Sequence, residues 1–419
     1  MATPLPARTS LDQATRRQVE ERLAGHDNHL AQAYPGDDGM RQPVHTVYVP
    51  ADRYHRDVAT EWGARARELV AASGGTAAVL EAVGVRPDLR DAVAAQVEDK
   101  LAREPVEDLR VDLEDGYGDH GDAAEDEAVL AAASGLREAI EAGTAPPFCG
   151  IRFKCLEAAT RARGLRTLDL FVTALAASGP LPDGLVLTLP KVTAAAQVEA
   201  MVEVCAALER ANDLPSARLR FEVQVETPQA ILDAGGTAGV ARMVHAGDGR
   251  ISGLHYGTYD YSASLGIAAA YQSLEHPAAD HAKAVMQLAA AETGVRLSDG
   301  STNVLPVGET SQVRAAWANH GRLVRRSLER GFYQGWDMHP GHLPSRFAAT
   351  YSFFREGFEP AAARLRAYAG RVEGAVLDEP ATAKALARFL RRGLDCGAIG
   401  AAELTDRTGL EPGALERLR

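Results

Sequence analysis

The sequence lacks the features that would place it in several large classes of protein. It has only four cysteines, which are scattered and lack the spacing of a metal site. We therefore expect reduced thiols and a cytoplasmic setting. Residues 1–10 contain no apolar segment typical of a secretory signal. No apolar run is long enough to span a bilayer, so we expect no membrane association.

An excess of basic residues is also missing. The formal net charge is −12, whereas a general nucleic-acid-binding protein needs a basic face, so we expect no nucleic-acid partner. No glycine-rich dinucleotide turn follows an early strand, which argues against an open doubly wound sheet. These absences leave room for a local basic pocket that binds an anionic small molecule.

What the chain does contain is a repeated alternation of short apolar segments and helical segments. With 419 residues and 46% hydrophobic residues, it can bury a large core. Strand–helix alternation predicts a parallel sheet, and eight such units over about 300 residues favour a closed (β/α)8 TIM barrel. The predicted strands are 44–50, 109–113, 150–153, 185–189, 219–225, 253–257, 294–298 and 332–337. We expect an N-terminal helical addition (1–43), the barrel (44–357) and a C-terminal helical extension (358–419).

The most informative segment is Phe-Glu-Val-Gln-Val-Glu-Thr-Pro, residues 221–228. It predicts a buried strand that ends at Glu226, followed by a helix capped by Thr227 with Pro228 in its first turn. Asp260 follows the next predicted strand, about one β-α-β unit further along. The two carboxylates are spaced to converge on one Mg²⁺ ion, which prefers oxygen ligands. The alternative is a pair of ordinary surface or helix-capping acids.

Other charged residues stand at predicted strand ends on the same rim. Arg152 ends the third strand and is suited to grip a carboxylate with two hydrogen bonds, or to form a structural salt bridge. Asp112, Glu114 and Asp115 form an acidic turn that either orients Arg152 and metal-bound water or is a solvated loop. Lys191 follows the fourth strand, where it can pair with these acids or with the substrate. A Schiff base on this lysine is unnecessary beside a metal site.

Several strand ends together resemble one family, and they occur in the order of that family. The matching pieces are 47–50, 112–116, 151–153, 189–192, 225–228, Asp260 with 265–266, and 331–332 through 338–340. This set, spread over residues 44–385, resembles the citrate lyase beta-subunit and HpcH/HpaI aldolase family. That family includes malyl-CoA lyases and belongs to the pyruvate/phosphoenolpyruvate barrels.

The resemblance implies a carbon–carbon lyase that depends on Mg²⁺, or on Mn²⁺, and acts on a 2-oxo acid or a 3-hydroxyacyl-CoA through a metal-stabilised enolate. It makes Glu226 and Asp260 the metal ligands. Arg152 becomes a catalytic clamp on the substrate, and Glu114 and Lys191 become substrate contacts. It also implies a homo-oligomer, either a trimer or a hexamer.

The resemblance further suggests two acid/base candidates. The metal-dependent aldolases of the family carry a histidine in the acidic turn, where this chain has Asp115 and no histidine before His120. In the acyl-CoA lyases, an aspartate after a glycine-led apolar run serves the site of its own or a neighbouring subunit. Asp378 matches that residue, and its alternative role is to cap a helix at 381–391. His339 either shapes the floor of the pocket or is a buried structural histidine.

Two other functions stay open at this stage. One is phosphoryl transfer on phosphoenolpyruvate, although the chain has no Gly-x-x-x-x-Gly-Lys-Ser/Thr loop. The other is a metabolite-binding barrel without turnover, because a fold alone does not fix function. For coenzyme A phosphates the candidates are Arg53, Arg56, Arg65 and Arg67, and their alternative is a solvated helix face.

Overall fold

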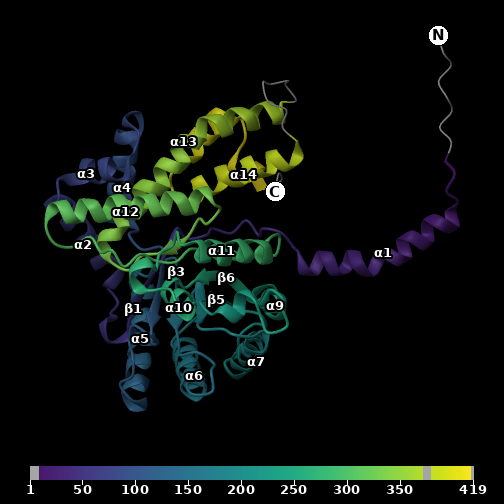
Figure 1. Ribbon diagram of the computed structural model, residues 1–419, viewed down its shortest axis with the longest axis horizontal. Helices are drawn as coiled ribbons and strands as arrows, with labels where there is room; N and C mark the ends of the chain where they lie inside the picture. The colour runs from purple at the N-terminus through teal and green to yellow at the C-terminus, as the bar shows by residue number, and fades with distance from the viewer. Residues whose placement is uncertain (1–8, 371–378, 417–419) are drawn as a thin grey trace, which may run out of the picture.

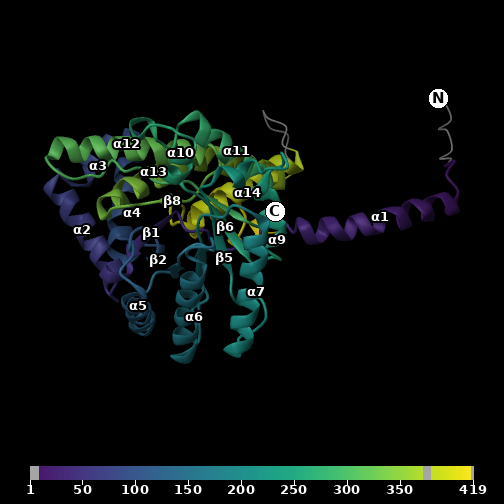
Figure 2. The same cartoon turned by 60° about the horizontal axis from the view of Figure 1, so that its bottom comes forward.

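Eight parallel strands form the centre of the protein. The computed structural model describes residues 9–370 and 379–416. The strands are β1 (His45–Pro50), β2 (Asp108–Asp112), β3 (Phe148–Arg152), β4 (Leu185–Leu189), β5 (Phe221–Val225), β6 (Ile251–Tyr256), β7 (Arg296–Ser298) and β8 (Gly335–Trp336). They pair in the order β7-β6-β5-β4-β3-β2-β1-β8, and a parallel bridge between Ser298 and Gln334 joins the two outer strands. The predicted TIM barrel is therefore confirmed (Figures 1 and 2).

Helices cover the outside of this barrel. Between β1 and β7 they are α2 (Val58–Ala72), α3 (Gly75–Val83), α4 (Arg90–Arg103), α5 (Asp122–Ala142), α6 (Arg161–Ala177), α7 (Ala195–Ala211), α8 (Pro228–Ile231), α9 (Gly239–Ala246), α10 (Thr258–Ser264) and α11 (Pro277–Ala290). Next come α12 (Thr310–Glu329), the short 3₁₀ helix η4 (Pro340–His342) and α13 (Leu343–Ala369). The chain then continues with α14 (Pro380–Asp395), α15 (Ala401–Thr408) and α16 (Pro412–Glu416). The segment between β1 and β2 thus contributes three helices to the outer layer.

A layer of paired charges fills the inside of the barrel. Arg110 on β2 donates to Glu222 on β5 at 2.9 Å, and it also bonds to Asp108. His255 on β6 lies 2.9 Å from the same Glu222 carboxylate. All four residues are buried, and burial of a charge is costly unless it is paired. The charged groups of this layer therefore compensate one another inside the barrel.

The C-terminal helices pack on each other through a second apolar cluster. Phe358 and Leu365 of α13 meet Leu390 of α14, Leu404 of α15 and Leu415 of α16 in this cluster. Helix α13 runs through residue 357 without a break. The boundary between barrel and extension at this residue stays a prediction.

The N-terminal helix α1 (Gln13–Ala33) projects away from the barrel, and it contains no buried residue (Figures 1 and 2). Within 9–370 and 379–416, no helix is both long enough and apolar enough to cross a membrane.

Candidate active site

Most of the candidate residues lie at the carboxyl ends of the strands, the face where TIM barrels carry their active sites. Arg152 is the last residue of β3, Lys191 follows β4, and Glu226 follows β5. Glu114 and Asp115 follow β2, and Asp260 lies in the first turn of α10, directly after β6. Asp378 lies outside the described residues. We call the described set of six residues the rim.

Glu226 is a buried carboxylate with little compensation. Its side chain is 3% exposed, and Oε1 accepts a hydrogen bond from the backbone N–H of Lys191 at 2.8 Å. The pKa of Glu226 is raised to about 7, mainly by burial, with Asp260 and Glu114 acting in the same direction and Arg152 and Lys191 acting against it. A cation beside this carboxylate would offset its burial.

Glycine at position 257 allows the end of β6 to approach Glu226 closely. A methyl group built on Gly257 would overlap the Glu226 side chain and come within 2.5 Å of Oε2. Asp260 follows Gly257 within one helical turn, and its negative charge acts on the Glu226 carboxyl. Two oxygen-donor carboxylates from neighbouring strand ends fit the preference of Mg²⁺.

Replacing Gly257 by alanine is expected to displace the Glu226 carboxylate and weaken Mg²⁺ binding by about tenfold or more, the effect of about 1.4 kcal/mol. Gly253→Ala is the matched control on the same strand, because its new methyl group would meet atoms no nearer than 3.4 Å. Calorimetric titration of both variants with Mg²⁺ measures the difference. Equal Mg²⁺ affinities for the two variants would contradict the placement of the ion beside Glu226.

Arg152 is held rigidly by its neighbours. Its Nε and Nη2 donate to the two oxygens of Asp112, each at 2.6 Å, and its Nη1 lies 3.6 Å from Glu114. Its guanidinium group lies 4.7 Å from the ring centre of Tyr48 and 5.6 Å from that of Trp336. Burial acts to lower the pKa of Arg152, but Asp112 more than offsets this and holds the pKa above its ordinary value. Among the acids expected to orient Arg152, Asp112 therefore makes the main salt bridge, and Glu114 lies farther away.

Tyr48 and Trp336 also belong to this site, although neither was predicted from the sequence. Both rings lie against Arg152, and their centres are 4.5 Å apart. Tyr48 on β1 and Trp336 on β8 belong to paired neighbouring strands, since Thr46 is in register with Trp336. The alternation of side chains along β1 could have placed Tyr48 toward the barrel interior, whereas β8 is too short to show a pattern.

Lys191 connects the acidic turn to the Glu226 side of the rim. Its Nζ bonds to Glu114, and it donates to Asp115 at 2.7 Å. Its φ of +50° is unusual for a residue with a side chain, and the backbone N–H in this conformation donates to Glu226. Burial acts to lower the pKa of Lys191, but hydrogen bonds to Asp115 and Glu114 raise it overall. Lys191 is therefore a charged partner of the acids and a poor Schiff-base nucleophile.

Two acids of the turn, Glu114 and Asp115, have pKa values shifted in opposite directions. Burial raises the pKa of Glu114. For Asp115, burial acts in the same direction, but hydrogen bonds from Lys191 and from the turn lower the pKa overall. A carboxyl with a lowered pKa is a weak base, so Asp115 serves more readily as an ion-pair partner.

A basic hollow adjoins the rim at the end of β1. Its empty volume is about 830 Å³, open solvent included, and its lining includes Tyr48, Arg53, Trp62, Arg65 and Pro340. Two of the four arginines considered for coenzyme A phosphates therefore line this hollow. Glu61 also lines the hollow and lies 3.9 Å from Arg65. The other two arginines have partners outside it: Arg56 lies 3.4 Å from Asp57, and Arg67 donates to the carbonyl of Gly63.

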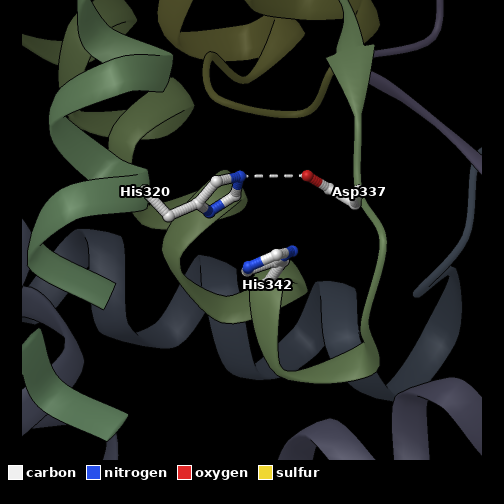
Figure 3. Close-up of side chains that lie close together, drawn as sticks. All are labelled: His320, Asp337 and His342. Atoms are coloured by element: carbon white, nitrogen blue, oxygen red, sulfur yellow. Dashed lines mark ion pairs between the residues drawn. The ribbon is translucent and has the colours of Figure 1, made fainter. Parts of the chain in front are cut away.

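A second polar cluster lies outside the rim. His320 on α12, Asp337 after β8 and His342 on η4 bring one potential ligand atom each within 4.8 Å of one another (Figure 3). Arg346 already donates to Asp337 at 2.7 Å, and His320 lies 3.1 Å from the same carboxylate. The two histidine rings are stacked with centres 4.4 Å apart. Because Arg346 already neutralises Asp337, a metal ion would add uncompensated buried charge. We interpret this cluster as structural.

Two smaller expectations have direct structural outcomes. Thr227 stands immediately before α8, but its hydroxyl donates to the carbonyl of Val192 at 2.6 Å and makes no cap hydrogen bond, so the capping role was wrong. His339 is partly buried, and its Nδ1 accepts from the N–H of Gly341 at the start of η4.

Comparisons with known proteins give a family match and similar folds. The model of a family described as "Domain of unknown function (DUF6986)" matches residues 23–419. No curated protein matches the chain. A structure of CitE from Mycobacterium tuberculosis, in complex with magnesium, acetoacetate and coenzyme A, is 18% identical. That match covers 89% of this chain and 100% of the other, with a TM-score of 0.48.

Two further structures also match most of the chain. Malate synthase from Haloferax volcanii, as a magnesium/glyoxylate complex, is 14% identical over 90% of this chain and 97% of the other, with a TM-score of 0.49. An HpcH/HpaI aldolase/citrate lyase family protein from Burkholderia cenocepacia J2315 is 15% identical. It covers 75% of this chain and 94% of its own, with a TM-score of 0.40.

Proposed function

The chain belongs to the DUF6986 family, whose description names no activity, and we propose that it is a Mg²⁺-dependent carbon–carbon lyase of the citrate lyase and aldolase type. The observation that carries this proposal is Glu226, a buried carboxylate at a strand end whose pKa is raised to about 7. Strongly perturbed pKa values of this kind concentrate at functional sites.

Each rim residue is proposed either to bind the metal ion or the substrate, or to set the charge of the pocket. Glu226 and Asp260 would hold the metal ion, and Mg²⁺ bound there would act as a Lewis acid toward an oxo or carboxylate oxygen. Arg152 is fixed by Asp112, which leaves its Nη1 as the nitrogen available to a carboxylate or thioester oxygen of the substrate. Lys191 and Glu114 would set the charge on the other side of the pocket.

The proposed substrate is a 2-oxo acid or a 3-hydroxyacyl-CoA. The support for an acyl-CoA is the basic hollow, where Arg53 and Arg65 lie beside Trp62 and next to Tyr48, the ring that contacts Arg152. Arginine guanidinium groups can form two hydrogen bonds to a phosphate group, and an aromatic ring can stack on the adenine base of coenzyme A. Asp378 is the first candidate for the group that moves a proton to or from the substrate carbon, and Asp115, whose ion pair with Lys191 makes it a weaker base, is the second.

Exchange of the methyl protons of pyruvate tests this proposal and does not require the natural substrate. We expect the protein to catalyse the exchange of these protons with solvent deuterium in the presence of Mg²⁺. Proton NMR measures the rate of this exchange. The Glu226→Gln/Asp260→Asn variant serves as the control and is expected to show only the rate of Mg²⁺ in buffer. Mg²⁺-dependent binding of pyruvate without any exchange would instead favour a metabolite-binding barrel.

A further inference from the structure

A second cleft lies at the opposite end of the barrel from the rim. It is lined by residues at the amino ends of strands, among them Val44 before β1, Arg296 and Leu297 on β7, and Tyr333 before β8. Helices α14 and α16 close its other side, with α13 alongside α14 (Figure 1). The empty volume is about 1220 Å³, open solvent included. No residue of the rim lines this cleft.

Two arginines on α14 turn toward this cleft without hydrogen-bond partners. Within 9–370 and 379–416, neither Arg388 nor Arg392 donates a hydrogen bond to a protein acceptor, and the Nε of Arg388 is buried and unpartnered. Asp37 and Glu292 also line the cleft, at ion-pair distance but too far for direct hydrogen bonds: Asp37 lies 4.0 Å from each arginine, and Glu292 lies 3.6 Å from Arg388. An incoming oxyanion could therefore bond to both forks without breaking an existing hydrogen bond.

The other two basic residues in the cleft already donate hydrogen bonds. Arg391 donates to Asp395 at 2.9 Å and to Glu416 at 2.8 Å. Arg296 donates to the carbonyl of Met40 at 3.1 Å. The unmet hydrogen-bonding capacity is thus concentrated on Arg388 and Arg392, one helical turn apart on the same face of α14.

Apolar groups form the rest of the cleft wall. They include Val44, Leu297, Phe354, Leu415 and the side chain of Met40, which is 67% exposed. The guanidinium of Arg392 lies 4.0 Å from the centre of the Tyr333 ring, which keeps it at the apolar wall. A concave, mostly apolar surface with a few converging charged groups is the usual form of a small-molecule site.

We propose that this cleft is a second ligand site, which binds a small organic anion with a phosphate or carboxylate head on an apolar body. The head would bond to Arg388 and Arg392, and the body would cover Met40 and Val44. Because TIM barrels carry their chemistry at the other face, the ligand would be an effector rather than a substrate.

Calorimetric titration with 1-naphthyl phosphate, in buffer with EDTA, tests the proposal. The Arg388→Gln/Arg392→Gln variant is expected to bind this probe about tenfold or more weakly, as the loss of charge-assisted hydrogen bonds requires. Arg86→Gln/Arg103→Gln is the matched control, since both arginines are more than half exposed and lie outside the cleft. The rim variant Glu226→Gln/Asp260→Asn is expected to bind the probe as the wild type does.

Further probes and one further variant separate the contributions of head and body. 1-Naphthol and inorganic phosphate, which lack the head and the body respectively, are each expected to bind more weakly than 1-naphthyl phosphate. The ratio of affinities for 1-naphthyl phosphate and 1-naphthoate then identifies the preferred head. Met40→Glu changes an exposed side chain and is expected to weaken binding of both anions. Equal binding of 1-naphthol and 1-naphthyl phosphate, or unchanged binding by the double arginine variant, would overturn the proposal.

Discussion

Replacing Glu226 by glutamine is expected to stabilise the metal-free protein at pH 8 and to abolish its stabilisation by Mg²⁺. The cause is the raised pKa of the buried carboxyl, which is about 7 compared with an ordinary value of 4.5. Glutamine keeps the oxygen that accepts from Lys191 but removes the negative charge. A residue retained for metal binding is thus expected to lower the free energy of unfolding when the metal is absent.

The dependence on pH gives this prediction a sign and a size. A carboxyl whose pKa is raised on folding stabilises the folded state below its unfolded pKa, and this stabilisation is lost as the pH rises through the folded pKa. For pKa values of 4.5 and about 7, the loss is roughly 3 kcal/mol, at about 1.4 kcal/mol for each pKa unit. Glu226→Gln should therefore match the wild type in stability near pH 4 and exceed it by up to about that amount at pH 8.

Urea unfolding at several pH values, with and without Mg²⁺, measures these free energies. Asp115→Asn is the matched control, because the pKa of Asp115 is lowered and its removal should not stabilise the protein. A Glu226→Gln variant that is less stable than the wild type at pH 8 without metal would contradict the assignment of an uncompensated carboxylate.

Replacing Arg152 by methionine is expected to destabilise the protein by about 3–5 kcal/mol, because it leaves the buried carboxylate of Asp112 without its partner. The same change is expected to abolish pyruvate proton exchange. Arg152→Lys keeps the charge but loses the bidentate hydrogen bonding to Asp112. It should therefore be more stable than the methionine variant and still catalyse pyruvate proton exchange slowly. Urea unfolding and NMR exchange rates measure the two effects separately.

Arg250 supplies the control for a purely structural pair. It is buried and donates to both oxygens of Glu209, at 2.6 and 2.9 Å, immediately before β6 at the amino end of the barrel. Arg250→Met should lose a similar amount of stability. Under conditions where this variant is folded, it should still catalyse pyruvate proton exchange. If both methionine variants retain exchange when folded, Arg152 is structural and has no part in the reaction.

The fold was accessible from the sequence because short segments rich in apolar residues alternate regularly with helical segments. Leu185–Leu189 was predicted with the bounds that the structure shows, and the other seven strands were found with shifted ends. Buried parallel strands give this kind of signal, since both faces are covered. The weakest signal belonged to the last strand, where Gly335–Trp336 contains only two residues and its position depends on pairing with β1.

The candidate site was accessible only in part. The end of a strand marks a position on the rim, so Glu226, Arg152 and Lys191 could be placed there from order alone. The pairing of Arg152 with Asp112 and the stacking on Tyr48 and Trp336 depend on distances across strands, which the sequence does not contain. The cleft on the other face was even less accessible from the sequence, since it brings residues near position 40 together with residues near position 390.

The most direct test of the account is a calorimetric titration of the protein with Mg²⁺, with and without pyruvate or oxaloacetate. The wild type is expected to bind one Mg²⁺ ion at the rim and to bind the oxo acid only when the metal is present. The Glu226→Gln/Asp260→Asn variant is expected to bind neither. Unchanged binding by this variant, or a wild type that binds no Mg²⁺, would contradict a metal site at Glu226 and Asp260, and with it the proposed lyase.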